Sequence, residues 1–419
     1  MRILLIHQMF LERDDGGGSR FNEMTKTWTE EGHEVTVLAG MVHYNTGKKP
    51  AKYKGKFIFS DKYNTRLEVI RCHVSESYNV NFLGRLWGYF SFVFSSIYAG
   101  FFHLRGKYDL ILVTSPPLFV GITGYILSKL KRLPLVFEVR DLWPESAIDT
   151  GVISNKFIIK FAYWFESIIY KNSEKINVLT PAFKEILIAN KNVSADKIIF
   201  IPNAADFTIS DRLIDDGFDV RAFRKKLGWE ENFVLLYVGA HGVANHLIQV
   251  IDTALLIQKT MPQVLFVMIG EGMQKEMLIE KTKAFNLNNV QFIDSVSKNE
   301  VFKYIMSSNF GMSVLKKVDT FKTIYSNKTF DYMACKKPVF LLIDGVSKDL
   351  IEKANCGFYV EPENPENFAE KIEYVLKQSP EYIIELGENG YHFAKENFDR
   401  TKLAKKYLNH LESLIKKNN

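Results

Sequence analysis

The chain has 419 residues, a formal net charge of +6 at pH 7, and 47% hydrophobic and 24% charged residues. This composition excludes an intrinsically disordered chain, and the length predicts two domains, because a single hydrophobic core rarely extends so far. The three cysteines are scattered without metal-ligand spacing, which is typical of a reducing compartment such as the cytoplasm.

The excess of positive charge belongs to the first half, and much of it lies between Lys48 and Arg71. Such a patch suits anionic lipid or nucleic acid, although a solvated loop is the simpler interpretation. We find no helix-turn-helix, RNA-binding aromatic pair or zinc knuckle, so no nucleic-acid partner is expected. The first apolar run, which ends at Ile6, is too short for a signal peptide.

Short apolar runs recur through the first half at the spacing of an alternating α/β fold. They predict strands at Ile3–Ile6, Val35–Leu38, Leu67–Ile70, Leu110–Val113, Leu135–Val139, Ile176–Leu179 and Ile198–Ile201. Longer periodic segments at Phe21–Glu31 and Phe157–Tyr170 predict helices between them, and Gly32 is a helix-stop signal.

Within the first half, Leu86–Leu104 contains no Lys, Arg, Asp or Glu. Its length permits a transmembrane helix, but small residues at helical spacing favour a helix packed on the sheet. An interfacial helix is the third interpretation, in which partly exposed Trp87, Phe90 or Phe94 docks on a bilayer with help from the basic patch.

A second series of predicted strands comprises Phe233–Val238, Val264–Ile269, Val290–Ile293, Phe310–Leu315 and Val339–Ile343. The polar stretch 206–219 separates the two series, and we place the domain boundary there. The predicted fold class is α/β, with two facing Rossmann-like domains, 1–205 and 206–395, whose parallel sheets flank a cleft. Asn364 and Pro365 begin a further helix, and 396–419 contains an amphipathic helix that crosses back to the first domain.

The segment Ser326–Cys335 lies between the last two of these strands and predicts a short helix at the carboxyl edge of the second sheet. Ser326 or Asn327 would cap it, leaving backbone N–H groups that, with Lys328, suit an anion. Asp331, one turn further on, would accept hydrogen bonds from a sugar hydroxyl. These residues suggest a nucleotide or nucleotide-sugar site, whereas the alternative is a solvated pair of Lys328 and Asp331.

Three glycine-containing loops follow predicted strands, where open parallel sheets bind ligands. They are Gly16-Gly17-Gly18 in the first domain, and Gly239-Ala240-His241-Gly242 and Gly270-Glu271-Gly272 in the second. His241 is a candidate phosphate contact, although a lone histidine near a helix start is often a cap or a surface residue.

The segment Arg140–Glu145 follows a strand of the first domain and contains one guanidinium and two carboxylates. Asp141 or Glu145 would receive an acceptor hydroxyl, and Arg140 would bind a phosphate; a structural pair of Arg140 and Asp141 is the alternative. No Asp-x-Asp motif or His/carboxylate cluster appears, so we expect no metal site and no cofactor.

Taken together, these motifs resemble the bacterial retaining glycosyltransferases of family 4, which have the GT-B fold, over almost the whole chain. Further elements that carry the resemblance are Gly16–Arg20, Gly32–Val37, Thr114–Pro117 with Pro116, Glu138–Glu145, Ile201–Asn203 and Ser326–Val339. The Arg-Asp-Leu-Trp-Pro-Glu-Ser and Gly-x-His-Gly elements are most similar to the subgroup that transfers N-acetylated amino sugars in O-antigen and capsule assembly.

The resemblance implies a UDP-sugar donor bound by the second domain. Its base would lie near Gly270, Glu271 and Gly272, and its ribose against Asp331. The diphosphate would lie by Lys328, Ser326, Asn327 and the loop containing Gly239, His241 and Gly242, covered by Gly17 and Gly18. Acceptor contacts would come from Arg140, Asp141, Glu145 and Pro116.

The implied acceptor is a saccharide linked to undecaprenyl diphosphate, at the inner face of the cytoplasmic membrane. The paired glutamates of the family correspond here to Thr323 and Asp331, so the first carboxylate is absent. Two other functions therefore stay open: a UDP-sugar epimerase on the same fold, and a non-catalytic membrane-associated scaffold.

Overall fold

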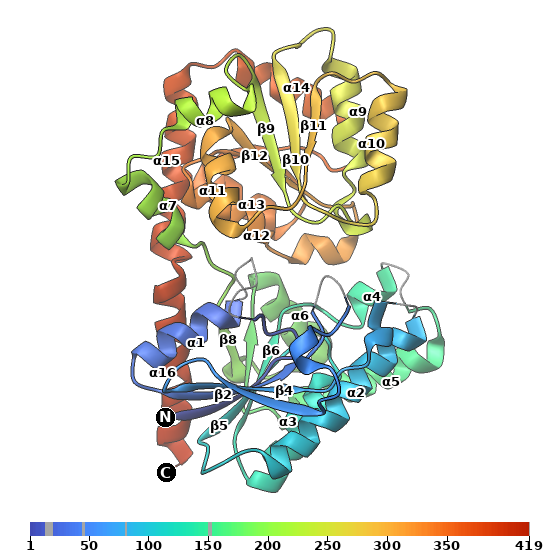
Figure 1. Ribbon diagram of the computed structural model, residues 1–419, viewed down its shortest axis with the longest axis vertical. Coiled ribbons are helices and arrows are strands. Elements are labelled where there is room, and N and C mark those ends of the chain that lie inside the picture. Colours follow the sequence, from blue (N-terminus) through green and yellow to red (C-terminus); the bar gives the residue numbers. More distant parts are fainter. Residues whose placement is uncertain (13–19, 44–46, 80–81, 150–152, 419) are drawn as a thin grey trace. The chain divides into compact units, whose positions relative to one another are not determined.

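The structure is a computed structural model that describes residues 1–12, 20–43, 47–79, 82–149 and 153–418. The chain divides into two compact units, one formed by Met1–Pro202 with Thr401–Asn419 and the other by Asn203–Arg400. The boundaries expected from the sequence lie a few residues away, after residues 205 and 395. Each unit is an α/β layer structure, as predicted (Figure 1).

The described strands of the first unit form one sheet in the order β3-β4-β2-β1-β5-β6-β7-β8. β3 runs antiparallel to β4, and the other pairings in this sheet are parallel. Their bounds are β1 Arg2–Ile6, β2 Glu34–Gly40, β3 Ile58–Lys62, β4 Leu67–Cys72, β5 Leu110–Thr114, β6 Leu135–Val139, β7 Lys175–Val178 and β8 Ile198–Phe200. The apolar runs predicted these strands except β3, a half-exposed edge strand.

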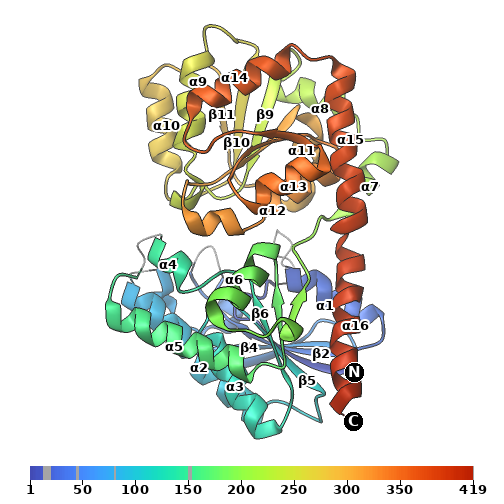
Figure 2. The ribbon, with the colours of Figure 1, turned by 180° about the vertical axis from the view of Figure 1, so that it is seen from behind.

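The helices of the first unit cover this sheet. They are α1 Arg20–Glu30, η1 Ala51–Tyr53, η2 Glu76–Asn79, α2 Phe82–Phe102, α3 Val120–Lys131, α4 Glu145–Asp149, α5 Lys156–Asn172, α6 Pro181–Lys191, η3 Ala195–Lys197 and α16 Arg400–Asn418. α16 lies beside α1 in this unit (Figure 2), where the Trp28 Nε1–H donates to the Ala404 carbonyl at 2.9 Å. The predicted amphipathic C-terminal helix therefore covers α1.

The second unit has a parallel sheet in the order β11-β10-β9-β12-β13-β14. Its strands are β9 Phe233–Val238, β10 Val264–Ile269, β11 Val290–Ile293, β12 Phe310–Val314, β13 Val339–Leu342 and β14 Gly357–Tyr359. Its helices are α7 Phe207–Asp215, α8 Val220–Leu227, η4 Val243–Asn245, α9 Ile248–Ile257, α10 Lys275–Ala284, α11 Lys298–Ser307, η5 Asp319–Thr323, α12 Asn327–Ala334, α13 Val346–Ala354, α14 Pro365–Leu376 and α15 Pro380–Asn397.

Alternate residues of β9 enter two different cores, one on each face of this sheet. Val234 and Leu236 join the cluster beneath α12, and Leu235 and Tyr237 join the cluster beneath α9 and α14. This alternation is expected for a strand that is buried on both faces. Because the sheet is parallel, the loops after β9, β10 and β12 all leave from its carboxyl edge.

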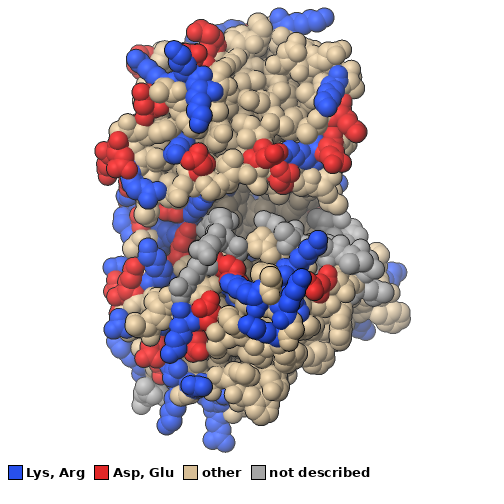
Figure 3. All heavy atoms as spheres, viewed as in Figure 1, with Lys and Arg blue, Asp and Glu red and all other residues tan. Residues whose placement is uncertain are grey.

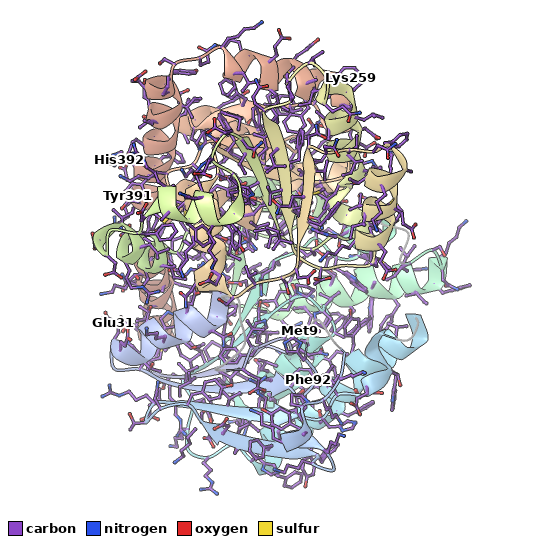
Figure 4. All side chains as sticks on the ribbon, turned by 45° about the horizontal axis from the view of Figure 1, so that its top comes forward. Met9, Glu31, Phe92, Lys259, Tyr391 and His392 are labelled. Carbon is purple, nitrogen blue, oxygen red and sulfur yellow. The ribbon has the colours of Figure 1, made fainter. Side chains whose placement is uncertain are left out.

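α15 packs on α12 and α13 in the second unit. Tyr391, labelled in Figure 4, lies by α7, and its hydroxyl donates to Asp211 Oδ1 at 2.9 Å. The Lys395 ammonium donates to the other oxygen of the same carboxylate at 2.7 Å. Side chains of α15, which packs on α12, therefore hold α7 against α15.

The uncharged segment of the first unit forms most of α2. Phe92 and Ala99 are buried toward the sheet, whereas Trp87 and Phe94 are exposed, and Phe90 is half-buried. Among the described residues, we find no helix with the length and apolarity needed to span a bilayer. α2 thus packs on the sheet along one side only.

Lysine and arginine side chains of the first unit gather around η1 and the β3–β4 pair (Figure 3). Several of these side chains form ion pairs or hydrogen bonds within the unit. Lys52 pairs with Glu12 at 2.8 Å, and Arg71 is buried and donates to the carbonyls of Phe10 and Leu11. Part of the basic segment is therefore structural and not a free electrostatic surface.

Candidate functional site

α12 is held at the carboxyl edge of the second sheet by hydrogen bonds from its buried face. The Tyr332 hydroxyl accepts from the Val238 N–H at 3.1 Å and donates to the Met312 carbonyl at 3.2 Å. The hydroxyls of Ser313 and Thr329 lie 2.7 Å apart. A Cβ at Gly311 would lie only 2.2 Å from the Tyr332 ring, so glycine is required there for this close packing.

The first turn of α12 opens a cavity of about 450 Å³ within the second unit. Ser326, Asn327, Lys328 and Asp331 line it together with Gly239, and apolar side chains of neighbouring elements complete the wall. Ser326 is the residue before the helix, but its side chain makes no capping hydrogen bond, which corrects one expectation from the sequence. The structure thus brings together Asp331, predicted for the ribose, with four of the residues predicted for the diphosphate: Gly239, Ser326, Asn327 and Lys328.

The Lys328 ammonium lies over the ring of Tyr237, with Nζ 4.9 Å from the centroid. Burial lowers the pKa of Lys328 to about 8, and the Asp331 carboxylate opposes part of this shift. Burial raises the pKa of Asp331 to about 6; among its charged neighbours, Asp206 adds to this shift, whereas Lys298 and Lys328 oppose it. Two oppositely charged groups with shifted pKa values on one cavity are typical of a functional site.

The two glycine loops of the second unit pack directly against each other. The His241 N–H donates to the Glu271 carbonyl at 2.8 Å, and the Gln274 N–H donates to the His241 carbonyl at 2.9 Å. Gly270 has φ +144°, and a Cβ there would lie 2.0 Å from the Gly239 carbonyl oxygen. The loops after β9 and β10 therefore form one backbone assembly, of which Gly239 reaches the cavity.

The side chain of His241 is buried between aromatic rings, with centroids 6.0 Å from Tyr237 and 6.1 Å from Phe292. Burial lowers its pKa to about 4, so the imidazole is neutral at pH 7, and neither ring nitrogen has a hydrogen-bond partner. In this arrangement the His241 side chain does not line the cavity at α12, and its contact with a phosphate stays a prediction. Gly242 follows it in the loop, and a Cβ added there would meet Asn245 Nδ2 at an ordinary contact distance of 3.8 Å.

The side chains of Glu271 and Thr323 do not line the cavity at α12. The Glu271 carboxylate pairs with Lys275 at 2.8 Å, and Lys275 also donates to Asp294 at 2.5 Å. The Thr323 hydroxyl donates to the Thr320 carbonyl at 2.6 Å in η5, and Thr323 does not line the cavity. Gly272 lies under the His241 backbone. Gly17 and Gly18 lie outside the described residues.

The predicted acceptor residues follow β5 and β6 in the first unit. Asp141 Oδ2 accepts from the Ser146 hydroxyl at 2.7 Å, and burial raises the pKa of this carboxyl. Glu145 forms an ion pair with Lys191, so it already has a cationic partner. Pro116 is exposed after β5.

His7 and Gln8, at the carboxyl end of β1, were missed in the sequence analysis. Both side chains are 2% exposed, and His7 Nδ1 and both polar atoms of the Gln8 side chain have no hydrogen-bond partner among the described residues. Burial lowers the pKa of His7, and the charges of Arg140 and Arg71 lower it further. Polar residues that directly follow a buried strand are the signal that points to them. They extend the candidate acceptor site around Arg140.

Within the described residues, no cluster of three or more His, Cys, Asp or Glu side chains is placed to hold a metal ion. The cavity at α12 offers one ammonium group, one carboxylate and backbone N–H groups. Such a set suits a phosphate ester that also carries hydroxyl groups.

Two family models match the chain, and the boundary between their matches lies close to the boundary between the two units. Residues 15–204 match a family model described as a glycosyl transferase 4-like domain, and residues 219–393 match one described as glycosyl transferases group 1. A comparison with curated protein sequences finds no match.

Solved structures share this fold over nearly the full length of the chain. HepE of Anabaena, solved in complex with UDP, has 18% identity and a TM-score of 0.70, covering 99% of this chain and 100% of its own. Sucrose-phosphate synthase of Thermosynechococcus elongatus has 17% identity and a TM-score of 0.72, with 99% and 98% covered. WaaG, a glycosyltransferase involved in lipopolysaccharide biosynthesis, has 16% identity and a TM-score of 0.69, with 98% and 99% covered.

Proposed function

Because this chain is a glycosyltransferase of the GT-B fold, matched by two family models over its two halves, we propose that it takes its sugar from a UDP-sugar. The observation that carries this proposal is the convergence of Lys328, Asp331 and Gly239 on the cavity at the start of α12. The UDP complex of HepE, which shares the fold, supports a uridine nucleotide as the ligand. The donor is thus proposed to bind within the second unit.

In this proposal each group on the cavity has one role. The Lys328 ammonium and the free N–H groups of the first turn of α12 hold the diphosphate. The Asp331 carboxylate accepts hydrogen bonds from the ribose hydroxyls. The backbone of Gly239 passes close to the phosphates, because any side chain there would approach Lys328 Cε and the Tyr237 hydroxyl to 3.3 Å.

The reaction breaks the bond between the anomeric carbon and the diphosphate oxygen. The bonding electron pair leaves with UDP, so negative charge grows on the oxygen beside Lys328 and is stabilised there. The acceptor hydroxyl oxygen forms the new bond to the anomeric carbon and passes its proton to an oxygen of the departing diphosphate. We propose that the configuration of the sugar is retained and that no metal ion or cofactor takes part.

The donor sugar is proposed to be an N-acetylated amino sugar, on the resemblance of the Arg140–Ser146 and Gly239–Gly242 segments to that subgroup. The proposed acceptor is a saccharide linked to undecaprenyl diphosphate, met at the inner face of the cytoplasmic membrane during surface polysaccharide synthesis. His7, Gln8 and Arg140 of the first unit are its proposed binding residues.

A donor screen tests this function. Several UDP-sugars are incubated with the protein, with and without a lipid-diphosphate-linked saccharide, and UDP release is measured. Acceptor-dependent release is expected, with the anomeric configuration of the product read by NMR and no loss of rate in EDTA. Conversion of the UDP-sugar to an isomer without UDP release would instead show the epimerase.

A further inference from the structure

α2 presents a line of aromatic side chains to solvent. Trp87, Phe94 and Phe101 recur every seventh residue, so they lie along one side of the helix, and Phe102 is 72% exposed beside them. The opposite side packs inward through small and aromatic residues, with Phe92 inside the unit (Figure 4) and Ser95 donating to the His73 carbonyl at 2.7 Å. Tyr98 on this side meets Phe57, with ring centroids 5.5 Å apart, whereas the side chains of Trp87, Phe94, Phe101 and Phe102 are each at least half exposed.

α5 carries a second line of the same kind. Phe157, Phe161 and Trp164 recur at helical spacing, and Phe157 is 86% exposed. α2, α3 and α5 lie together on one side of the first unit in both ribbon views (Figures 1 and 2). Contacts between α2 and α3 and between α3 and α5 place them in one layer.

Stacked and tilted ring contacts connect α5 to α2 through the interior of this layer. Phe161 lies 6.4 Å from Phe165, Phe165 lies 6.3 Å from Phe119, and Phe119 lies 5.0 Å from Phe90 of α2. The layer that carries both lines of exposed rings therefore has an aromatic interior.

The charges of this layer have one sign at the surface. α2, α3 and α5 contain a single carboxylate, Glu166, which is 1% exposed and pairs with Lys191 at 2.7 Å. Exposed lysines flank the aromatic lines on α3 and α5, at Lys129, Lys131, Lys156, Lys160 and Lys171. Exposed aromatic rings among lysines without exposed carboxylates complement an anionic lipid surface.

We propose that the outer faces of α2 and α5 dock the first unit on an anionic lipid bilayer, with the aromatic rings in the interfacial layer and the lysines against lipid phosphates. α2 then lies in the interface and does not cross the membrane, consistent with its buried inner side. This docking would place the enzyme at the membrane that holds its acceptor, and it rests on the proposed function only for the lipid-linked acceptor. It also assigns to α5 a role that the sequence did not indicate.

Vesicle co-sedimentation of the full chain tests the docking. Vesicles of phosphatidylcholine with about one-third phosphatidylglycerol are compared with pure phosphatidylcholine at increasing salt. Binding is expected only with the anionic lipid and is expected to weaken with salt. The triple variant Phe157→Ser, Phe161→Ser, Trp164→Ser should bind at least about tenfold more weakly, because it loses three inserted rings. Lys156→Glu with Lys160→Glu should lose a similar factor at low salt only.

The matched control is Tyr374→Ser with Ile384→Ser, which removes exposed apolar side chains of the second unit and should leave vesicle binding unchanged. The proposal is overturned if the wild type ignores anionic vesicles or if the triple variant binds them normally. It is also overturned if the wild type is a dimer without lipid and the triple variant is a monomer, since the surface is then a self-association interface. Calorimetry with UDP separates the two proposals. If the wild type binds anionic vesicles but does not bind UDP, the donor site is refuted and the docking is not.

Discussion

The Nζ atom of Lys328 lies 4.9 Å from the centroid of the Tyr237 ring. The ring belongs to the end of β9, and its hydroxyl donates to the Ala240 carbonyl at 2.8 Å, which fixes its orientation. An aromatic face attracts a cation without neutralising it. The ammonium group is therefore held at the cavity with its full charge available to an anionic ligand.

Replacing Lys328 by alanine should lower turnover at least about a hundredfold, which corresponds to about 3 kcal/mol of lost transition-state stabilisation. UDP affinity should fall as well, because the same charge contacts the bound diphosphate. Steady-state kinetics and calorimetry measure both effects. Lys377→Ala, which removes an exposed lysine paired with Glu373 on α14, is the control and should behave as wild type. Near-normal turnover of the Lys328 variant would refute the assignment.

The pH dependence of kcat/KM should be bell-shaped, with limbs near pH 6 and pH 8. Below about 6 the Asp331 carboxylate becomes protonated and loses its ability to accept from ribose hydroxyls. Above about 8 the free enzyme loses the Lys328 proton, and with it the charge that attracts diphosphate. Bound diphosphate should raise the pKa of Lys328, so the alkaline limb of kcat should lie at higher pH than that of kcat/KM.

Asp331 and Lys328 should change the free energy of unfolding with pH in opposite directions. The raised pKa of Asp331 stabilises the fold only at low pH, and this contribution is lost as the pH rises through about 6. The lowered pKa of Lys328 contributes stability at high pH that is lost as the pH falls through about 8. Urea unfolding from pH 4 to 10, with Asp331→Asn and Lys328→Met for comparison, should show each slope disappear in its own variant.

Gly270→Ala should destabilise the second unit by at least about 2 kcal/mol, because the new Cβ would lie 2.0 Å from the Gly239 carbonyl oxygen at a φ that alanine disfavours. UDP affinity should fall with it, since Gly239 lines the cavity. Gly242→Ala is the matched control, because its Cβ would meet nothing closer than Asn245 Nδ2 at 3.8 Å. Equal melting temperatures for the two variants would contradict the packing of the two loops.

In the first unit, Arg20→Met should cost about 3 to 5 kcal/mol, because it leaves the buried Glu138 carboxylate without its cation. Arg20 also donates to the Ile201 carbonyl at 2.7 Å. The double variant Arg20→Met, Glu138→Leu should be more stable than the single one, since no unpaired charge remains. Urea unfolding followed by near-UV circular dichroism measures this; a double variant that is less stable than Arg20→Met would argue against a paired buried charge.

Local pattern was sufficient for most of the sheets, because a strand buried on both faces is a nearly continuous apolar run, as in Ile3–Ile6 of β1, Leu110–Val113 of β5 and Phe233–Val238 of β9. It failed for β3 and β14, which are short and half-exposed, and whose strand conformation depends on the neighbour they pair with. It did not indicate the surroundings of the His241 ring, because Phe292, which lies far along the chain, helps to bury that ring.

The sequence by itself determined that two α/β units alternate along this chain and that Lys328 and Asp331 begin a helix after a buried strand, because hydrophobic periodicity and helix signals act over a few neighbouring residues. Only the tertiary structure decided which side chains share an environment. It placed Tyr237 beneath Lys328, buried His241 beside Phe292, joined Arg20 to Glu138, and set the aromatic faces of α2 and α5 in one layer. Burial and charge act between residues that are close in space, and the chain order does not record those distances.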